Sequence, residues 1–205
     1  MARKGIRMLK EGARIGHQFH VGEMSTVVQI FLYEKVVVNS ITHNLAAVNY
    51  WRKSDIINLE KVQAMLLKNI LKLPESTPYW GLLNELGIWP LEDVVNYKKM
   101  LLLQNILSSD DSRLTKQLIT HQKRFEIEES WYSNLNNIGK KYRIEMENEE
   151  IMKDKKTGKM HVKGQIMKNV IERSKEKVKS MTKLRHQNEK TSSCKAMSKR
   201  QTFTE

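Results

Sequence analysis

The chain has 205 residues, of which 40% are hydrophobic, and a net charge of +13. Nine glycines and three prolines are too few for the turns of a β-sandwich or barrel, so we expect an all-α fold, an irregular bundle of several helices. The single cysteine cannot form an intramolecular disulfide or a zinc ribbon, and the basic N-terminus lacks the apolar stretch of a signal peptide. Polar residues interrupt the apolar run 27–48, so we expect no membrane-spanning helix and an intracellular protein, nuclear or cytoplasmic.

Positive charge gathers toward the end of the sequence. Residues 140–205 carry 19 Lys or Arg against nine Asp or Glu, whereas residues 46–139 carry 11 of each. We predict a loose basic N-terminal arm over 1–23, a neutral helical body over 24–139 and a basic arm over 140–205. Such an arm either binds a polyanion, most often nucleic acid, by releasing condensed counterions, or is a solvated tail without a ligand.

The first predicted helix starts near Ser25, whose side chain is expected to cap it. Its apolar residues recur at helical spacing and are expected to share a broad face: Val27, Ile30, Phe31, Val37, Val38, Ile41 and Leu45. The β-branched run 36–38 fits a strand as well, but the spacing favours a helix.

A second helix is predicted from Ser54, as its cap, to Pro74. Asp55 falls in the first turn, where a carboxylate complements the helix dipole. The expected apolar face consists of Leu59, Val62, Leu66, Ile70 and Leu73.

A corner rich in Pro and Trp follows, ESTPYWGLLNELGIWPLE at 75–92. Pro78 is expected to fix a tight turn, YWGLLNEL to form about two helical turns closed by Gly87, and Pro90 to begin the next long helix. The residues of this structural corner are Pro74, Ser76, Thr77, Pro78, Trp80, Gly87, Trp89 and Pro90. Its tryptophans and leucines are predicted to form a small core of its own, so we interpret the corner as structural rather than ligand-binding.

The long helix after Pro90 is expected to have an apolar face formed by Val94, Tyr97, Leu101, Leu102 and Ile106. A further helix is predicted to start near Ser109 or Asp110, and a short one to end at Gly139.

The segment KDKKTGKMH is interpreted as a charged break with a turn at Gly158. A basic amphipathic helix is predicted after it, over about 162–186. Its apolar face is expected to consist of Val162, Ile166, Val170, Ile171, Val178 and Met181. The final residues lack periodicity and are expected to be disordered.

Few residues suggest catalysis or a cofactor. Asp110 and Asp111 have the pairing that holds magnesium ions in polymerases, but their place at a helix junction favours capping. The pairs His17 with His20 and His186 with Cys194 each supply only two zinc ligands. No glycine-rich phosphate loop or nucleophilic serine elbow occurs, so we predict no enzyme activity, no metal, no cofactor and no small-molecule substrate.

The order of LEKVQAMLLKNILKLP, ESTPYWGLLNELGIWPLE and YKKMLLLQNILSSDDSRL resembles the region just after the polymerase core of non-LTR retrotransposon reverse transcriptases. The resemblance is closest to the Dong-like branch, which carries a restriction-like endonuclease, and covers Met24 to Arg124, with a weaker part over 130–186. It implies a helical thumb and linker that packs on the polymerase and helps to hold template RNA and target DNA. In that comparison the corner prolines, Ser76, Thr77 and Gly87 match scaffold residues.

The chain lacks the aromatic-x-Asp-Asp signature of the polymerase, the zinc-motif cysteines and the acidic cluster of the nuclease. It therefore resembles a truncated, non-catalytic remnant that binds RNA or DNA backbones weakly and without sequence preference. The expected nucleic-acid-binding residues are Lys61, Lys68, Lys98, Lys99, Lys163, Lys168, Arg173, Lys175, Lys179, Lys183 and Arg185. Two alternatives stay open: a protein-interaction module that inserts the apolar face of 162–181 into a partner's groove, and a translated remnant without function.

Overall fold

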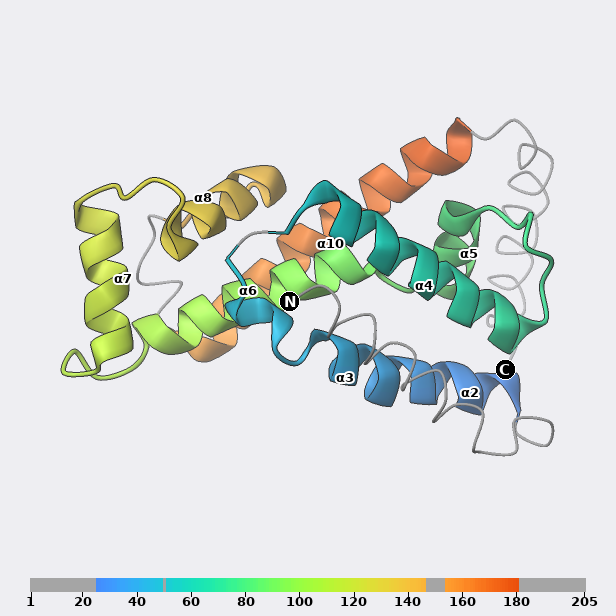
Figure 1. The fold of residues 1–205 in the computed structure, drawn as a ribbon, viewed down its shortest axis with the longest axis horizontal. Helices are drawn as coiled ribbons and strands as arrows, with labels where there is room; N and C mark the ends of the chain where they lie inside the picture. The colour runs from blue at the N-terminus through green and yellow to red at the C-terminus, as the bar shows by residue number, and fades with distance from the viewer. Residues whose placement is uncertain (1–24, 50, 147–153, 181–205) are drawn as a thin grey trace, which may run out of the picture.

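The computed structural model describes residues 25–49, 51–146 and 154–180. These residues form a bundle of helices without a strand, which confirms the predicted all-α fold (Figure 1). In chain order the elements are α2 (Thr26–Leu32), a π-helix (Tyr33–Val37), α3 (Val38–Thr42), a 3₁₀-helix (Leu45–Ala47), α4 (Lys53–Leu71), α5 (Tyr79–Leu86), α6 (Leu91–Leu107), α7 (Leu114–Arg124), α8 (Trp131–Tyr142) and α10 (Lys155–Lys179). The arm predicted over 1–23 and the tail predicted to be disordered lie outside the described residues.

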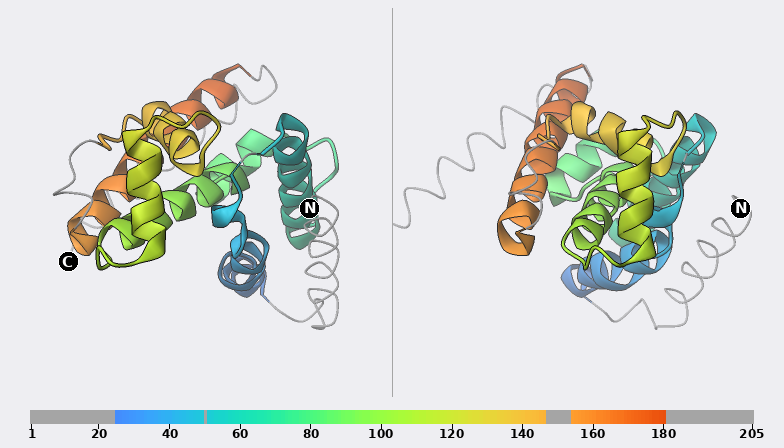
Figure 2. Two further views of the ribbon diagram at one scale, coloured as in Figure 1. Left: turned by 60° about the vertical axis from the view of Figure 1, so that its left-hand side comes forward. Right: turned by 90° about the vertical axis from the view of Figure 1, so that its left-hand side faces the viewer.

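Helix α6 lies at the centre of the bundle and contacts α3, α4, α7, α8 and α10. Figure 2 shows α4 and α10 on opposite sides of it. None of its residues from Leu91 to Gln104 is exposed, because neighbours pack around it. The apolar face predicted for this helix is incomplete. Val94, Tyr97 and Ile106 are half-buried and pack against the core, and Leu101 and Leu102 are also half-buried. The prediction omitted the residues that are fully buried: Leu91, Val95, Met100 and Leu103.

Helix α10 belongs to the core of the bundle. Val162 and Ile166 are both at 0% exposure and pack with Met100 and Leu103 of α6 and Leu135 of α8. The boundary that the sequence predicted at residue 140 falls inside α8, and the helix assigned to a basic arm packs against α5, α6 and α8. The apolar face predicted for this helix is thus buried within the chain, except that Ile171 is 41% exposed and Met181 lies outside the described residues.

The start of α10 corrects the prediction of a turn at Gly158. Asp154 caps the helix, and its carboxylate accepts hydrogen bonds from the N–H groups of Lys156 (3.3 Å) and Thr157 (3.1 Å). The N–H of Gly158 donates to the Asp154 carbonyl at 2.8 Å, so this glycine is a buried helical residue. The cap stabilises a helix start earlier than the apolar periodicity indicates.

The first helical segment is confirmed as helix rather than strand, but its buried face differs from the prediction. Val27 and Phe31 are 77% and 56% exposed, whereas Tyr33 is 1% exposed. The five-residue π-helix after Leu32 explains the difference, because its wider turn rotates the residues that follow relative to those before it. Ser25 occupies the N-cap position, although its side chain makes no capping hydrogen bond.

Helix α4 begins two residues earlier than predicted. Arg52 is its N-cap and Ser54 lies within the first turn, so the cap predicted at Ser54 is wrong. The Asp55 carboxylate accepts from the Arg52 N–H at 3.3 Å, which is the contact that an acidic N3 residue makes with the N-cap in a capping box. The helix ends at Leu71, where Lys72 adopts a left-handed conformation with φ 53°.

Two other helix ends also differ from prediction. Helix α7 begins at Leu114 rather than near Ser109 or Asp110, and α8 continues past Gly139 to Tyr142. Gly139 is buried inside α8, where a Cβ atom would lie 2.7 Å from the sulfur of Met146. This glycine permits a close contact with the chain that follows the helix and does not end it.

The Pro- and Trp-rich corner forms as predicted, with α5 between Pro78 and Gly87. Gly87 has φ 66°, which a residue with a Cβ adopts only with strain. Pro90 is the N-cap of α6 rather than its first residue. The corner does not have a core of its own, because Leu82 and Leu83 pack into the cluster shared with α4 and the π-helix.

Gln63 of α4 fastens this corner to the bundle. Its side chain is fully buried and makes three hydrogen bonds: Nε2 donates to the Trp89 carbonyl (2.9 Å), and Oε1 accepts from the Tyr79 hydroxyl (2.7 Å) and the Leu91 N–H (3.0 Å). One amide thus satisfies polar groups on α5, on the connector and at the start of α6.

Replacing Gln63 with Leu is expected to lower the free energy of unfolding by about 2 kcal/mol or more, because three buried polar groups lose their partner. Urea denaturation followed by circular dichroism measures this difference. The control is Gln117→Leu, whose amide lies on the exposed face of α7. Equal effects of the two substitutions would contradict the role given to Gln63.

Candidate functional site

The residues predicted to bind nucleic acid separate into exposed and internal sets. Lys163, Lys168, Lys175 and Lys179 are exposed on α10, and Lys61 is exposed on α4. Lys68 is half-buried and donates to the Glu75 carbonyl at 2.5 Å. Lys183 and Arg185 lie outside the described residues, as do His17, His20, His186 and Cys194.

Lys99 is buried and Lys98 is half-buried, and both bind groups within the protein, contrary to their assignment to a phosphate-binding face. The Lys98 Nζ donates to the Asn39 Oδ1 at 2.9 Å and the Thr42 Oγ1 at 2.6 Å, which ties α6 to α3. Lys99 is 1% exposed. Consecutive lysines on a central helix face different neighbours, so both ammonium groups have partners within the protein.

Arg173 is half-buried, and it anchors α10 to α6. Its guanidinium forms an ion pair with Asp93, whose side chain is fully buried. Asp93 Oδ1 also accepts a hydrogen bond from the Tyr142 hydroxyl at 2.5 Å, and that hydroxyl accepts from Asn96 Nδ2 at 3.0 Å. Arg173 lies over the Trp80 ring at 5.3 Å, so α5, α6, α8 and α10 meet at this network.

Burial raises the pKa of Asp93, although the Arg173 guanidinium and the Tyr142 hydroxyl favour the ionised form. A carboxylate in this position depends on its partners, because its own desolvation is unfavourable. Burial likewise raises the pKa of Tyr142, which therefore stays protonated and donates to Asp93.

We expect Asp93→Ala to lower the free energy of unfolding by about 3 kcal/mol, since it leaves Arg173 and Tyr142 without their acceptor. Proteolysis within α10 should accelerate as well, because this helix loses its anchor. The control is Asp111→Ala, which removes a carboxylate 92% exposed and paired with Lys116 at 2.6 Å, and which should cost less than about 1 kcal/mol. A small effect of Asp93→Ala would show that apolar packing alone holds α10.

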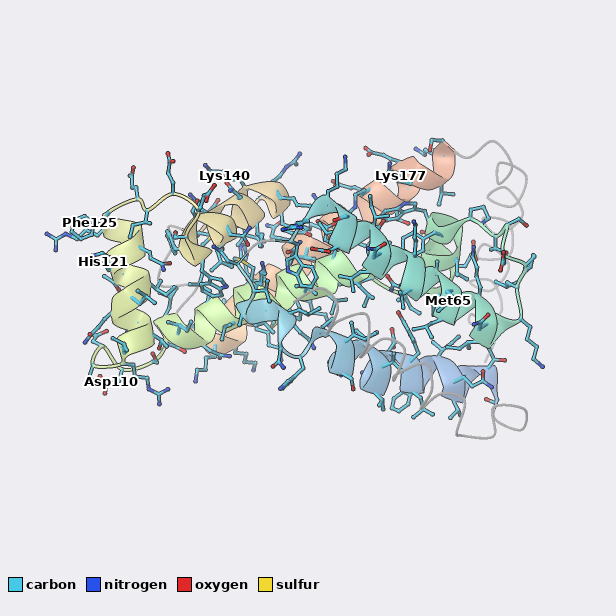
Figure 3. All side chains as sticks on the ribbon, viewed as in Figure 1. Met65, Asp110, His121, Phe125, Lys140 and Lys177 are labelled. Carbon is cyan, nitrogen blue, oxygen red and sulfur yellow. The ribbon has the colours of Figure 1, made fainter. Side chains whose placement is uncertain are left out.

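Charged residues, buried and exposed together, are distributed unevenly over the described part of the chain. Those before residue 140 carry 12 Lys or Arg and 12 Asp or Glu, whereas those from 140 to 180 carry 12 and four. Several exposed members of this set were not among the residues predicted to bind nucleic acid, including Lys140, Arg143, Lys155, Lys156, Lys159 and Lys177. Of these, the first five lie before the predicted start of the basic helix at 162, and Lys177 lies within it. Figure 3 shows Lys140 of α8 and Lys177 of α10 projecting from the same edge of the molecule. We name the exposed Lys and Arg residues from Lys140 to Lys179 the basic surface.

A pocket of about 190 Å³ lies between the start of α4, α6 and α8. Its apolar lining includes Trp51, Leu59 and Val95, and its charged lining consists of Glu92, Lys99 and Lys141. The Lys141 Nζ and the Glu92 Oε1 lie 2.5 Å apart and form an ion pair, and both of these side chains are partly exposed.

Lys99 lies in this pocket and is held by neutral acceptors. Its Nζ donates to the Asn49 carbonyl at 3.1 Å and to the Asn134 Oδ1 at 2.9 Å. Burial lowers the pKa of Lys99 to about 8. No sequence pattern signals this environment, because it depends on Asn49 and on Asn134 of α8, which are distant from Lys99 in the chain.

The lowered pKa of Lys99 predicts a pH dependence of stability. In the unfolded chain this lysine keeps an ordinary pKa near 10.5, so above about pH 8 the unfolded state binds more protons and stability rises with pH. The free energy of unfolding of the wild-type chain should therefore rise, relative to that of the Lys99→Met variant, between about pH 8 and pH 10. Urea denaturation at a series of pH values measures this difference. The exposed-site control Lys61→Met should show no such trend, and a flat difference for Lys99→Met would contradict the shift.

The acidic pair Asp110 and Asp111 makes contacts within the segment that leads into α7. The Asp110 Oδ1 accepts from the Ser112 N–H at 3.1 Å, a contact that lowers the pKa of Asp110, and Asp111 pairs with Lys116. Asp110 therefore stabilises the turn before α7 instead of capping the helix itself. No group of three or more His, Cys, Asp or Glu side chains suited to a metal ion occurs within the described ranges.

None of the helices described is long and apolar enough to cross a membrane. The chain matches no protein-family model, and no curated protein or solved structure shows significant similarity to it.

Proposed function

We propose that this chain is a non-catalytic helical module that binds the phosphate backbone of RNA or DNA through the basic surface. One observation carries the proposal: described residues before 140 are electrically neutral, whereas those from 140 to 180 hold an excess of eight positive charges. Phosphate contacts of this kind give affinity without reading sequence. An intracellular location, nuclear or cytoplasmic, fits such a ligand.

The packing of α10 supports this reading. Its apolar ridge of Val162, Ile166 and Val170 is buried, so the helix is held with Lys163, Lys168, Lys175 and Lys179 toward solvent. A rigid helix keeps charges at fixed spacing, which lowers the entropy lost on binding compared with a free tail. The resemblance to a retrotransposon thumb and linker, which holds template and target strands, points to the same class of ligand.

The alternative function, in which the apolar face of 162–181 inserts into a partner's groove, requires that face to be free. Three of the residues that would enter a partner's groove, Val162, Ile166 and Val170, are already packed in the core of this chain. Docking them elsewhere would first require α10 to leave the Asp93 network.

Binding to a fluorescent RNA hairpin and a DNA duplex should weaken linearly on a plot of log affinity against log salt. The triple variant Lys168→Ala, Lys175→Ala, Lys179→Ala should weaken binding to both ligands and reduce the slope by up to about 3, roughly one per lost phosphate contact. Fluorescence anisotropy across a salt series measures both quantities.

The matched control removes three exposed lysines from the neutral part of the chain, Lys35→Ala, Lys53→Ala and Lys72→Ala, with the same change in net charge. Equal losses in the two triple variants would show that net charge, not the basic surface, governs binding. Absence of binding at low salt by a folded chain would refute the proposal.

A further inference from the structure

The pocket beside Lys99 has the size of a ligand site for a small molecule. Its volume is about 190 Å³, and a cavity of about 150 Å³ lined by apolar side chains is sufficient for benzene. Leu59, Val95 and Ile138 supply an apolar wall, and all three are buried. A single ring or a short aliphatic chain therefore fits.

Lys99 is a buried cation without a counterion. No carboxylate forms an ion pair with it among the described residues, because Glu92 is engaged by Lys141 and Asp93 by Arg173. Its two acceptors, the Asn49 carbonyl and the Asn134 amide oxygen, are neutral and use two of the three N–H bonds of an ammonium. Buried ammonium groups are ordinarily paired with an anion.

A second donor of the same lining lacks a partner. The indole Nε1 of Trp51 is buried and makes no hydrogen bond within the protein. Asn134 and Asn137 add amide groups, and the one carboxylate of the lining, Glu92, is neutralised by Lys141. The lining thus offers hydrogen-bond donors and positive charge in excess of acceptors.

We infer that this pocket binds a small organic monocarboxylate with an apolar body of about one ring, its carboxylate bound by Lys99 and Trp51. Two unsatisfied donors match the two oxygens of one carboxylate, whereas a phosphate dianion would require more donors and more charge. The apolar body lies against Leu59, Val95 and Ile138. Lys141, which is paired with Glu92, belongs to both this site and the basic surface, but the two proposed carboxylate-binding residues do not. The site departs from the sequence-based expectation of no small-molecule ligand.

Benzoate tests the inference, with benzamide as a neutral analogue of the same shape. Isothermal titration of the full chain should show one benzoate site and affinity at least about tenfold weaker for benzamide, because the neutral amide forgoes the charge-assisted bond. Equal affinities, or no benzoate binding at concentrations up to about 20 mM, would overturn the inference.

Lys99→Met should reduce benzoate affinity at least about tenfold, whereas the exposed control Lys61→Met should leave it unchanged. Because Lys99→Met removes a buried group and can impair folding, Trp51→Phe provides a second variant that keeps the ring and removes only the donor. It should weaken benzoate binding severalfold.

Nuclear magnetic resonance provides a readout in the unaltered chain. Benzoate should shift the indole N–H resonance of Trp51 more than those of Trp80, Trp89 and Trp131, since only Trp51 among these lines the pocket. Shifts confined to the basic surface would identify nonspecific anion binding there and overturn the site.

Discussion

The ion pair between Asp93 and Arg173 determines how the charged part of this chain is presented. Asp93 is fully buried on the central helix α6, and its desolvation is offset by Arg173 and the Tyr142 hydroxyl. By pairing with Asp93, Arg173 fixes the rotation of α10 about its own axis. In that orientation the lysines of α10 face solvent. A helix carrying this much positive charge is thereby held on the bundle in one orientation.

Polar side chains inside the bundle specify its arrangement. Gln63 binds the corner, Lys98 binds α3 and Lys99 binds the connector and α8, each through hydrogen bonds that few alternative packings would satisfy. An apolar core alone tolerates repacking, whereas these residues have partners only in the observed arrangement. The same constraint leaves Lys99 beside a pocket without a counterion, which is the basis of the proposed carboxylate site.

Local features of the fold were predictable, and tertiary ones were not. The corner from Pro78 to Gly87 follows from residues that fix their own backbone, and the ridge of Val162, Ile166 and Val170 follows from helical spacing. The burial of Lys99 and Arg173 did not follow, because a lysine or arginine on a helix gives no indication of a buried acceptor distant in sequence. The rotation at Tyr33 also escaped prediction, since a π-helix has no pattern in the apolar spacing.

Lysine acetylation followed by mass spectrometry, with and without bound RNA, tests the central claim most directly. The proposed interface predicts slower modification of Lys163, Lys168, Lys175 and Lys179 in the complex, with unchanged rates at Lys53 and Lys72 of the neutral body. Uniform protection of all six lysines, or protection only on α4, would contradict a nucleic-acid interface centred on α10.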